Sequence, residues 1–324
     1  MVHKLRTAVI GVGYLGRFHA EKLAILPDSE LVAVADIDPE AAGRVAQALG
    51  VEAVCNYRDL LGRVDAVSIA VPTPSHFAVA RDCLINHVHV LLEKPIASTL
   101  EQAQALVDLA GRADKVLQIG HLERFNPAVV AALDGIVNQP MFIESHRLAP
   151  FNPRGTDISV ILDLMIHDID IILNLVGSPV RRIDASGMRV LCSDIDIANA
   201  RIQFENACVA NVTASRVSLK AERKMRLFQP DAYITIDFRN RKLAVFRKGE
   251  REIYPGIPEI ASDERIFPEG DALKSQIAAF LETIRRGAQP IVSGEDGKRA
   301  LATAMEIAQQ LTQPPPSCEG RQRR

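Results

Sequence analysis

Residues 7–16, TAVIGVGYLG, decide the fold of this chain, because a run of apolar residues leads there directly into three glycines. The next residues, RFHAEKLAIL, carry apolar side chains at helical spacing. In such a strand–turn–helix unit, Gly11 would allow a tight turn, Gly13 would let the backbone approach a pyrophosphate, and Gly16 would let helix and strand pack closely. The helix N-terminus offers N–H donors to phosphates. The pattern predicts a dinucleotide-binding loop, with a plain structural turn as the alternative.

An acidic residue follows the glycines at the spacing of a ribose-binding carboxylate. LVAVADID, residues 31–38, predicts a second strand that ends near Asp36, which lies 36 − 16 = 20 residues after the last glycine. A carboxylate repels a 2′-phosphate and Ile37 offers no cation, so we expect NAD rather than NADP, although Arg17 and Arg44 could reach a phosphate. We expect cofactor contacts at the glycine loop and the strand ends, namely Gly11, Gly13, Tyr14, Leu15, Gly16, Asp36, Ile37, Pro72, Thr73, His76, Glu93 and Lys94.

The remainder of the first half alternates strand-like and helix-like segments. AVSIAVPT, VHVLLEKP and KVLQIG are typical of short buried strands, and longer amphipathic stretches separate them. Strands that alternate with helices indicate a parallel sheet with right-handed crossovers. We therefore predict a doubly wound α/β domain of the Rossmann type.

Beyond Phe125 the pattern changes. A long apolar-periodic stretch at residues 159–176 precedes several strand-like segments that no helix separates, with tight turns at Glu205-Asn206 and Arg239-Asn240. This pattern predicts an α+β domain with an antiparallel sheet, closed by helices at residues 272–286 and 295–312. We divide the chain into a NAD-binding domain at 1–121, a substrate-binding and oligomerisation domain at 122–312 and a mobile tail at 313–324.

Composition narrows the classes of function. The 324 residues carry 38 basic and 40 acidic side chains, so the net charge of −2 provides no global field for nucleic acid or anionic lipid. No apolar run reaches the roughly 18 residues of a membrane helix, and the first residues lack a signal-peptide core. The five cysteines have no CxxC spacing, which favours reduced thiols. We expect a cytoplasmic protein without a nucleic-acid or membrane partner.

Two segments carry candidate reactive groups. Lys94 follows a predicted strand, at the edge where ligands of such sheets bind, although it could be a surface lysine beside a turn proline. In ILDLMIHDIDIIL, Asp163, His167 and Asp170 are spaced i, i+4 and i+7 and so share one face of an apolar helix. Such groups are costly to bury without a partner or a function. The alternatives are a histidine satisfied by a carboxylate and a solvated acidic pair. Because no second His or Cys falls at ligand spacing, we expect no metal.

Together, the glycine loop, VPTPSH, EKP, HLERFNP and DLMIHDID resemble the Gfo/Idh/MocA family of NAD(P)-dependent sugar and cyclitol oxidoreductases over almost the whole chain. The resemblance implies a Rossmann domain followed by an α+β domain with a large open-faced sheet. It also implies that Lys94, Asp163 and His167 form the catalytic group, with His167 as the base. His76 would flank the nicotinamide or serve only to begin a helix. Met165 stands where the family often has glycine, which implies a branch with its own pocket shape.

HLERFNPAV followed by DLMIHDIDIILNLVG resembles the branch that oxidises the C3 hydroxyl of UDP-N-acetylglucosamine, which feeds an aminotransferase of lipid A synthesis. Another sugar nucleotide, a free sugar or a cyclitol remains an alternative substrate, and a non-catalytic NAD-sensing protein is a second alternative. An uncovered apolar sheet face implies a homodimer or homotetramer. A diphosphate would need local cations, and the candidates are Arg124, Arg147, Arg154, Arg216 and Lys220, of which we select the first three as substrate-binding residues along with Asp163 and His167.

Overall fold

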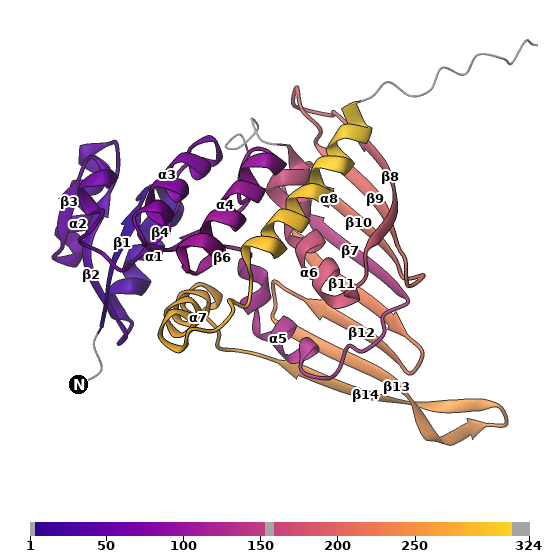
Figure 1. The fold of residues 1–324 in the computed structure, drawn as a ribbon. Coiled ribbons are helices and arrows are strands. Elements are labelled where there is room, and N and C mark those ends of the chain that lie inside the picture. Colours follow the sequence, from indigo (N-terminus) through magenta and orange to yellow (C-terminus); the bar gives the residue numbers. More distant parts are fainter. Residues whose placement is uncertain (1–3, 153–158, 313–324) are drawn as a thin grey trace, which may run out of the picture. The chain divides into compact units, whose positions relative to one another are not determined.

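The computed structural model describes residues 4–152 and 159–312, which form two compact units (Figure 1). The first unit contains residues 4–130 and 267–301, and the second contains 131–152, 159–266 and 302–312. Arg154 and the predicted tail lie outside the described residues. Within the described part, no helix is both long enough and apolar enough to cross a membrane.

The first unit is built on a parallel sheet of six strands in the order β3-β2-β1-β4-β5-β6. The order reverses between β1 and β4, and ligands of doubly wound sheets bind beyond the strand ends at such a point. The predicted α/β architecture is confirmed. The strands are β1 (Leu5–Ile10), β2 (Ser29–Ala35), β3 (Glu52–Val54), β4 (Ala66–Ile69), β5 (His89–Leu92) and β6 (Leu117–Ile119).

Local signals begin and end the helices of this unit. Asp38 caps α2 by accepting the Glu40 N–H at 2.9 Å, and Gly50 ends the same helix in the left-handed region with φ of 70°. Thr99 caps α4 by accepting the Gln102 N–H. The helices are α1 (Tyr14–Ile25), α2 (Pro39–Leu49), α3 (Thr73–Ile85), α4 (Leu100–Ala113), α5 (Pro127–Leu133), α7 (Ala272–Arg286) and α8 (Gly294–Thr312), of which α5 and α8 continue into the second unit.

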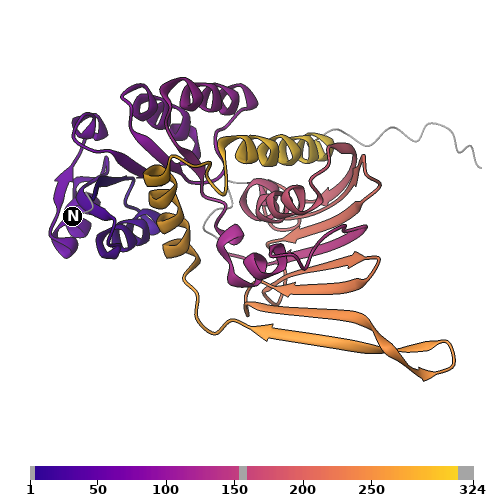
Figure 2. The same ribbon diagram turned by 60° about the horizontal axis from the view of Figure 1, so that its bottom comes forward.

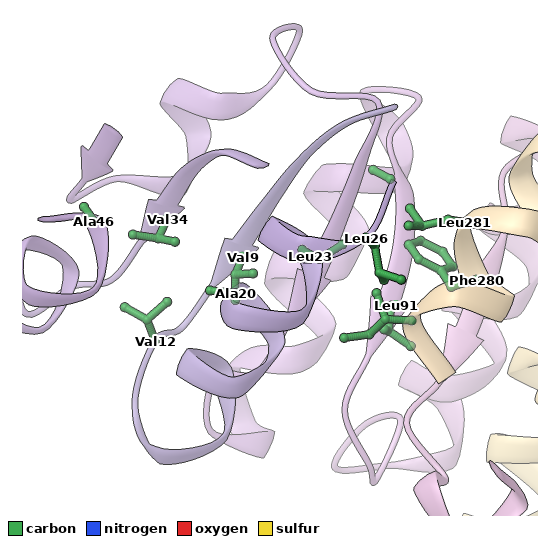
Figure 3. Packing of buried hydrophobic residues seen from close by; sticks show 12 residues of the cluster. Val9, Val12, Ala20, Leu23, Leu26, Val34, Ala46, Leu91, Phe280 and Leu281 are labelled. Atoms are coloured by element: carbon green, nitrogen blue, oxygen red, sulfur yellow. The ribbon is translucent and has the colours of Figure 1, made fainter. Parts of the chain in front are cut away.

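Helix α7 belongs to the first unit, which differs from the division that we predicted at residue 121. Its apolar face places Ile277, Phe280 and Leu281 in one buried cluster with Leu23 of α1 and Leu91 of β5 (Figure 3). These side chains are nearly inaccessible to solvent, so their burial holds α7 on the Rossmann sheet. Sequence order alone does not reveal this return of the chain, because the partners of α7 lie between 186 (277 − 91) and 258 (281 − 23) residues earlier.

The second unit is an eight-stranded, mainly antiparallel sheet in the order β14-β13-β12-β11-β7-β10-β9-β8, and one parallel pair joins β7 to β10. Helix α6 (Ile166–Val176) and the end of α8 lie on one face, and the other face is open (Figure 2). The turns at 205–206 and 239–240 are confirmed. The strands are β7 (Phe142–Leu148), β8 (Val180–Met188), β9 (Ile197–Phe204), β10 (Val209–Ser215), β11 (Glu222–Gln229), β12 (Ala232–Asp237), β13 (Lys242–Tyr254) and β14 (Ile257–Ile266).

Three of these strands were missed by the sequence reading. β7, FIESHRL, has polar side chains on its buried face as well as its half-buried one, β11, ERKMRLFQ, buries only Met225 and Leu227, and β14 is exposed along almost its whole length. Each therefore lacks the apolar run by which the other strands were recognised. The predicted helix at 159–176 also differs, because a π-helical turn (Ile161–Met165) precedes the regular α6. Its wider winding changes the direction of every side chain before Ile166 relative to the spacing that we assumed.

Candidate active site

The glycine loop connects β1 to α1 with the geometry that the sequence predicted. Gly11 has a φ of 83°, and a Cβ there would lie 2.8 Å from Val71 Cγ1 after β4. A Cβ at Gly16 would lie 1.7 Å from the Gly11 carbonyl oxygen, so only glycine permits this helix–loop contact. By contrast, a Cβ at Gly13 would meet nothing within 4 Å. The loop is thus closed toward the sheet and open at the position where a pyrophosphate would approach.

Asp36 lies beside this loop and holds it. One carboxylate oxygen accepts the Val12 N–H at 2.8 Å, and the other accepts the Asp38 N–H at 3.0 Å. The first turn of α1 has no acidic residue that would repel phosphate. Tyr14 and Ile37 are exposed, and Ile37 retains 94% of its accessible surface. A loop of N–H groups, a carboxylate after the end of β2 and an exposed apolar residue next to it together fit an adenine dinucleotide.

We expect Asp36→Asn to reduce the preference for NADH over NADPH about tenfold, because the amide still accepts one backbone N–H but no longer repels a 2′-phosphate. Fluorescence titration of both reduced cofactors measures the two dissociation constants. Asp38→Asn is the matched control, since it removes a neighbouring exposed carboxylate that caps α2. An unchanged ratio in Asp36→Asn would contradict the assignment of cofactor choice to this residue.

Lys94 follows β5, and the partly buried Glu93 carboxylate, 13% exposed, lies beside its backbone. The Lys94 N–H donates to Glu93 Oε2 at 3.2 Å, and Glu93 Oε1 lies 3.2 Å from His19 Nε2. We expected Glu93 among the cofactor contacts, but its carboxylate has these partners within the protein. The sequence reading missed His19, although its place on α1, three residues after Gly16, points it toward the sheet.

His76 connects two strand-end loops. Its Nδ1 lies 2.8 Å from the Pro95 carbonyl oxygen, and its Nε2 lies 2.8 Å from that of Val71. The ring is buried at 1% exposure, within a helix α3 that begins at Thr73 after Pro72. Burial lowers the pKa of His76, while the two carbonyls raise it. Of our two expectations, these contacts favour a structural role, in which the ring holds the Lys94-Pro95 segment against the loop after β4.

The α6 segment of the second unit carries the other candidate groups. Asp163 lies in the π-helical turn and His167 in the first turn of α6, and both are half-buried, whereas Asp170 is buried at 1% exposure. The shared face that we predicted for all three is therefore not a regular helical stripe. Met165 is fully buried, so its side chain fills the unit's interior.

The acid that anchors α6 is Asp168, which the sequence reading did not select. Arg147 Nε donates to Asp168 Oδ2 at 2.5 Å, and Ser145 Oγ donates to Asp168 Oδ1 at 2.8 Å. Both charged side chains are at least 97% buried, and the Arg147 guanidinium also lies 5.6 Å from the centre of the Phe238 ring. This ion pair ties the helix to β7 at the residue that directly follows His167.

Comparison with known proteins identifies the family. Residues 5–121 match the oxidoreductase family GFO_IDH_MocA, described as an NAD-binding Rossmann fold, and residues 138–236 match the GFO/IDH/MocA C-terminal domain. UDP-N-acetylglucosamine 3-dehydrogenase from Acidithiobacillus ferrooxidans is 41% identical over 307 residues, which cover 95% of this chain and 97% of that protein. The chain belongs to the Gfo/Idh/MocA family of oxidoreductases. NAD is its cofactor.

Solved structures and other members agree with this assignment. The structure of the Acidithiobacillus ferrooxidans UDP-N-acetylglucosamine 3-dehydrogenase has a TM-score of 0.89 at 39% identity and covers 96% of this chain and 98% of its own. A myo-inositol 2-dehydrogenase from Thermotoga maritima is 26% identical, with 92% of this chain and 93% of that protein covered. Sugar-nucleotide and cyclitol dehydrogenases are thus both relatives of this Gfo/Idh/MocA oxidoreductase.

The arginines that we selected for a diphosphate have different surroundings from those expected. Arg147 is engaged by Asp168, and Arg124 is buried at 4% exposure with Asp296 at 3.8 Å in the same unit. Arg216 is also buried, where its guanidinium donates to the Ile195 carbonyl at 3.2 Å. Lys220 is exposed, and Arg154 lies outside the described residues. An arginine that is buried against a carboxylate or a carbonyl has a partner within the protein. The sequence alone does not distinguish such an arginine from one that binds a ligand.

Among the described residues, no group of three His, Cys, Asp or Glu side chains is arranged to hold a metal ion. Cys55, Cys83, Cys192 and Cys208 are free thiols. Burial raises the pKa of the Cys83 thiol to about 12, so this cysteine is unreactive near neutral pH.

Proposed function

We propose that this enzyme oxidises the C3 hydroxyl of UDP-N-acetylglucosamine to the 3-keto sugar nucleotide with NAD. The observation that carries the proposal is the 41% identity to a UDP-N-acetylglucosamine 3-dehydrogenase along 95% of the chain. The position of Lys94 at a strand end of the Rossmann sheet and of His167 on α6 supports it. Asp36 and the open position at Gly13 supply the cofactor side.

In the proposed mechanism, a secondary alcohol loses its proton as hydride leaves the carbon, because the alcohol is too weak an acid to ionise beforehand. His167 takes the proton, since an imidazole can both accept and return one near neutral pH. Asp163 orients the sugar or the imidazole, and Lys94 donates a hydrogen bond to the reacting oxygen and stabilises its developing negative charge. NAD, when bound, supplies the hydride acceptor.

A cyclitol dehydrogenase is the second candidate, which the 26% identity to a myo-inositol 2-dehydrogenase favours. The rates at which the enzyme oxidises the two substrates distinguish the two candidate functions. With NAD and a panel of UDP-sugars, free sugars and inositols, we expect kcat/KM for UDP-N-acetylglucosamine to exceed that for myo-inositol by on the order of 10²-fold or more, because a site built for a nucleotide loses its partners with a free polyol. The reverse order would overturn the proposal in favour of the cyclitol.

The position of oxidation can be tested separately. UDP-N-acetylglucosamine deuterated at C3 should transfer deuterium to the nicotinamide, and mass spectrometry of the reduced cofactor detects it. The same substrate deuterated at C4 is the control and should yield unlabelled NADH. Transfer of deuterium from C4 instead of C3 would agree with UDP-N-acetylglucosamine as the substrate but would contradict oxidation at C3. If no substrate turns over while NADH still binds, a NAD-sensing protein becomes the better reading.

We also propose a homo-oligomer that forms through the open face of the second sheet. Phe142, Phe228, Tyr233 and Phe246 lie in register across β7, β11, β12 and β13, with neighbouring ring centres 5.8, 4.9 and 5.4 Å apart. On β7, Phe142 points to the face opposite to that of Ser145, which contacts α6. The row therefore lies on the uncovered side of the sheet. A row of partly exposed aromatic rings supports a dimer or tetramer.

The setting of the reaction is part of the same proposal. A 3-keto sugar nucleotide is a suitable amino acceptor, so an aminotransferase would consume the product, as in the synthesis of lipid A with 3-amino sugars. UDP-sugars are made in the cytoplasm, and we place the enzyme there. The near balance of 38 basic and 40 acidic residues supports a small-molecule substrate rather than a nucleic-acid partner.

A further inference from the structure

A row of buried polar groups lies next to the Lys94 backbone, and the mechanism above does not use it. Ser68 on β4 and His19 on α1 are 1% and 2% exposed, and His19 Nδ1 lies 2.7 Å from Ser68 Oγ. The other ring nitrogen, Nε2, lies 3.2 Å from Glu93 Oε1. The second oxygen of Glu93 accepts the Lys94 N–H at 3.2 Å. The row therefore runs from the centre of the Rossmann sheet to the candidate catalytic lysine, within one unit.

The fold makes room for the carboxylate in this row. Gly120 follows β6, and a Cβ there would lie 2.8 Å from Glu93 Oε1 and 3.1 Å from Glu93 Cα. Backbone bonds fix the same region, because the Glu93 N–H donates to the Ile69 carbonyl at 3.0 Å and the Gly120 N–H donates to the Leu92 carbonyl at 2.7 Å. Any side chain at position 120 would overlap the Glu93 carboxyl, so the glycine there leaves the space that this carboxyl occupies.

Hydrogen-bond chemistry defines the protons in this row. An ionised carboxylate only accepts, so His19 Nε2 carries the hydrogen that is donated to Glu93. The Ser68 hydroxyl can then donate to Nδ1, and a neutral imidazole satisfies both contacts. Ser68 therefore fixes the orientation of the His19 ring, and the ring in turn fixes the carboxylate.

The charges around Glu93 favour its ionised form. Burial alone would raise the pKa of this carboxyl, but the hydrogen bond from His19, together with the charge and the backbone N–H of Lys94, holds it below its ordinary value. Burial lowers the pKa of His76 on α3, and the negative charge of Glu93, which this histidine faces, offsets a small part of that lowering. A largely buried carboxylate without such partners would be costly to ionise and would tend to take up a proton.

We propose that Ser68, His19 and Glu93 are positioning residues for Lys94: they fix the backbone from which its side chain extends and hold a carboxylate against its N–H group. This inference rests on the role proposed for Lys94. The lysine side chain is long and flexible, so a fixed starting point limits where its ammonium group can lie. A displacement of about 1 Å in a reacting group can cost on the order of 10²-fold in rate.

Three variants separate this role from simple packing. His19→Leu removes both polar contacts of the ring, whereas His19→Gln can still donate to Glu93 and accept from Ser68. Glu93→Gln keeps the shape of the side chain but removes its charge. His89→Leu is the matched control, because His89 lies at the start of β5, at the opposite end of this strand from Lys94, and accepts the Val116 N–H at 3.0 Å.

The first readout does not depend on turnover. In protein labelled with ¹⁵N-lysine, the Lys94 amide resonance, assigned by its absence in Lys94→Arg, is followed from pH 4 to pH 9. In the wild type it should move only at the acid end, where Glu93 takes up a proton. In His19→Leu the midpoint should rise by about one pH unit or more, because the burial that raises the pKa is then less opposed. Glu93→Gln should show no such transition, and His89→Leu should match the wild type.

The second readout is the pH dependence of kcat with UDP-N-acetylglucosamine. We expect His19→Leu to lower kcat on the order of 10-fold or more at neutral pH and to move its acid limb to higher pH, with partial recovery in His19→Gln. Loss of packing alone would lower kcat equally at every pH. An unchanged midpoint and acid limb in His19→Leu, or an amide transition that persists in Glu93→Gln, would overturn the inference. If the amide titrates as expected but wild-type enzyme oxidises no UDP-sugar, the positioning contacts stand and the proposed substrate fails.

Discussion

His167→Asn should lower kcat by on the order of 10²- to 10⁴-fold while the dissociation constant of NADH stays within about twofold of wild type. Asparagine keeps a polar group of similar reach but cannot accept a proton in the transition state. The measurement is the formation of reduced nicotinamide from UDP-N-acetylglucosamine under saturating conditions, together with NADH fluorescence titration. His167 is not among the residues that we expect to hold the cofactor, which are the glycine loop, Asp36 and the strand ends, so cofactor affinity should be nearly unchanged.

His146→Asn is the matched control for this experiment. His146 lies on β7, one residue from Ser145 and Arg147, but on the alternate face of the strand, where Glu222 is 3.7 Å away and the ring is 40% exposed. Its replacement should leave kcat near the wild-type value. Wild-type turnover in His167→Asn would remove this histidine from the base role and leave Asp163 or Lys94 to take the proton.

Arg147→Met should destabilise the second unit by about 3–5 kcal/mol, because it leaves the fully buried Asp168 carboxylate without its cation. Urea unfolding followed by circular dichroism measures this loss. Arg147→Met combined with Asp168→Leu should recover most of it, since an apolar pair of similar volume no longer leaves a buried charge. Costs that simply add in the double variant would show that the two side chains stabilise the sheet independently.

The same variant tests our earlier assignment of Arg147 to the substrate diphosphate. At a temperature where Arg147→Met is still folded, a structural role predicts that UDP binds with an unchanged dissociation constant. A diphosphate ligand, in contrast, would lose a charge-assisted hydrogen bond and about tenfold or more in affinity. The contacts with Asp168 and Phe238 favour the first result.

Most of the cofactor side of the molecule was predictable from the sequence, because its signals are local. Gly11, Gly13, Gly16 and Asp36 act through backbone conformation and strand ends that lie within about 25 residues of one another. The end of the fourth predicted strand likewise placed Lys94 correctly after β5. Periodicity also gave α7 its bounds but not its partners, since helical spacing says only that an apolar face exists.

The contacts that support the candidate groups were not predictable, because they connect residues far apart in the chain. His19 contacts Glu93 across 74 positions (93 − 19 = 74), and Arg147 contacts Asp168 from another element. From a single sequence, a charged residue is interpreted as a solvent-exposed group or as a ligand-binding group. Its actual partner is known only once the pairing of the strands is known. The π-helical turn at Ile161–Met165 was hidden for a related reason, since its residues are ordinary helix formers in composition.

The double duty of Asp36 limits how this enzyme can be redesigned for another cofactor. The carboxylate that would discriminate against a 2′-phosphate also receives the Val12 and Asp38 N–H groups and so braces the phosphate loop. A small residue in its place would admit NADP, but the Val12 and Asp38 N–H groups would then have to bond to water or to a new partner. We expect the affinity for both cofactors to fall as a result. An engineered NADP-dependent enzyme therefore has to lose the negative charge at position 36 while an acceptor oxygen stays within reach of the Val12 amide.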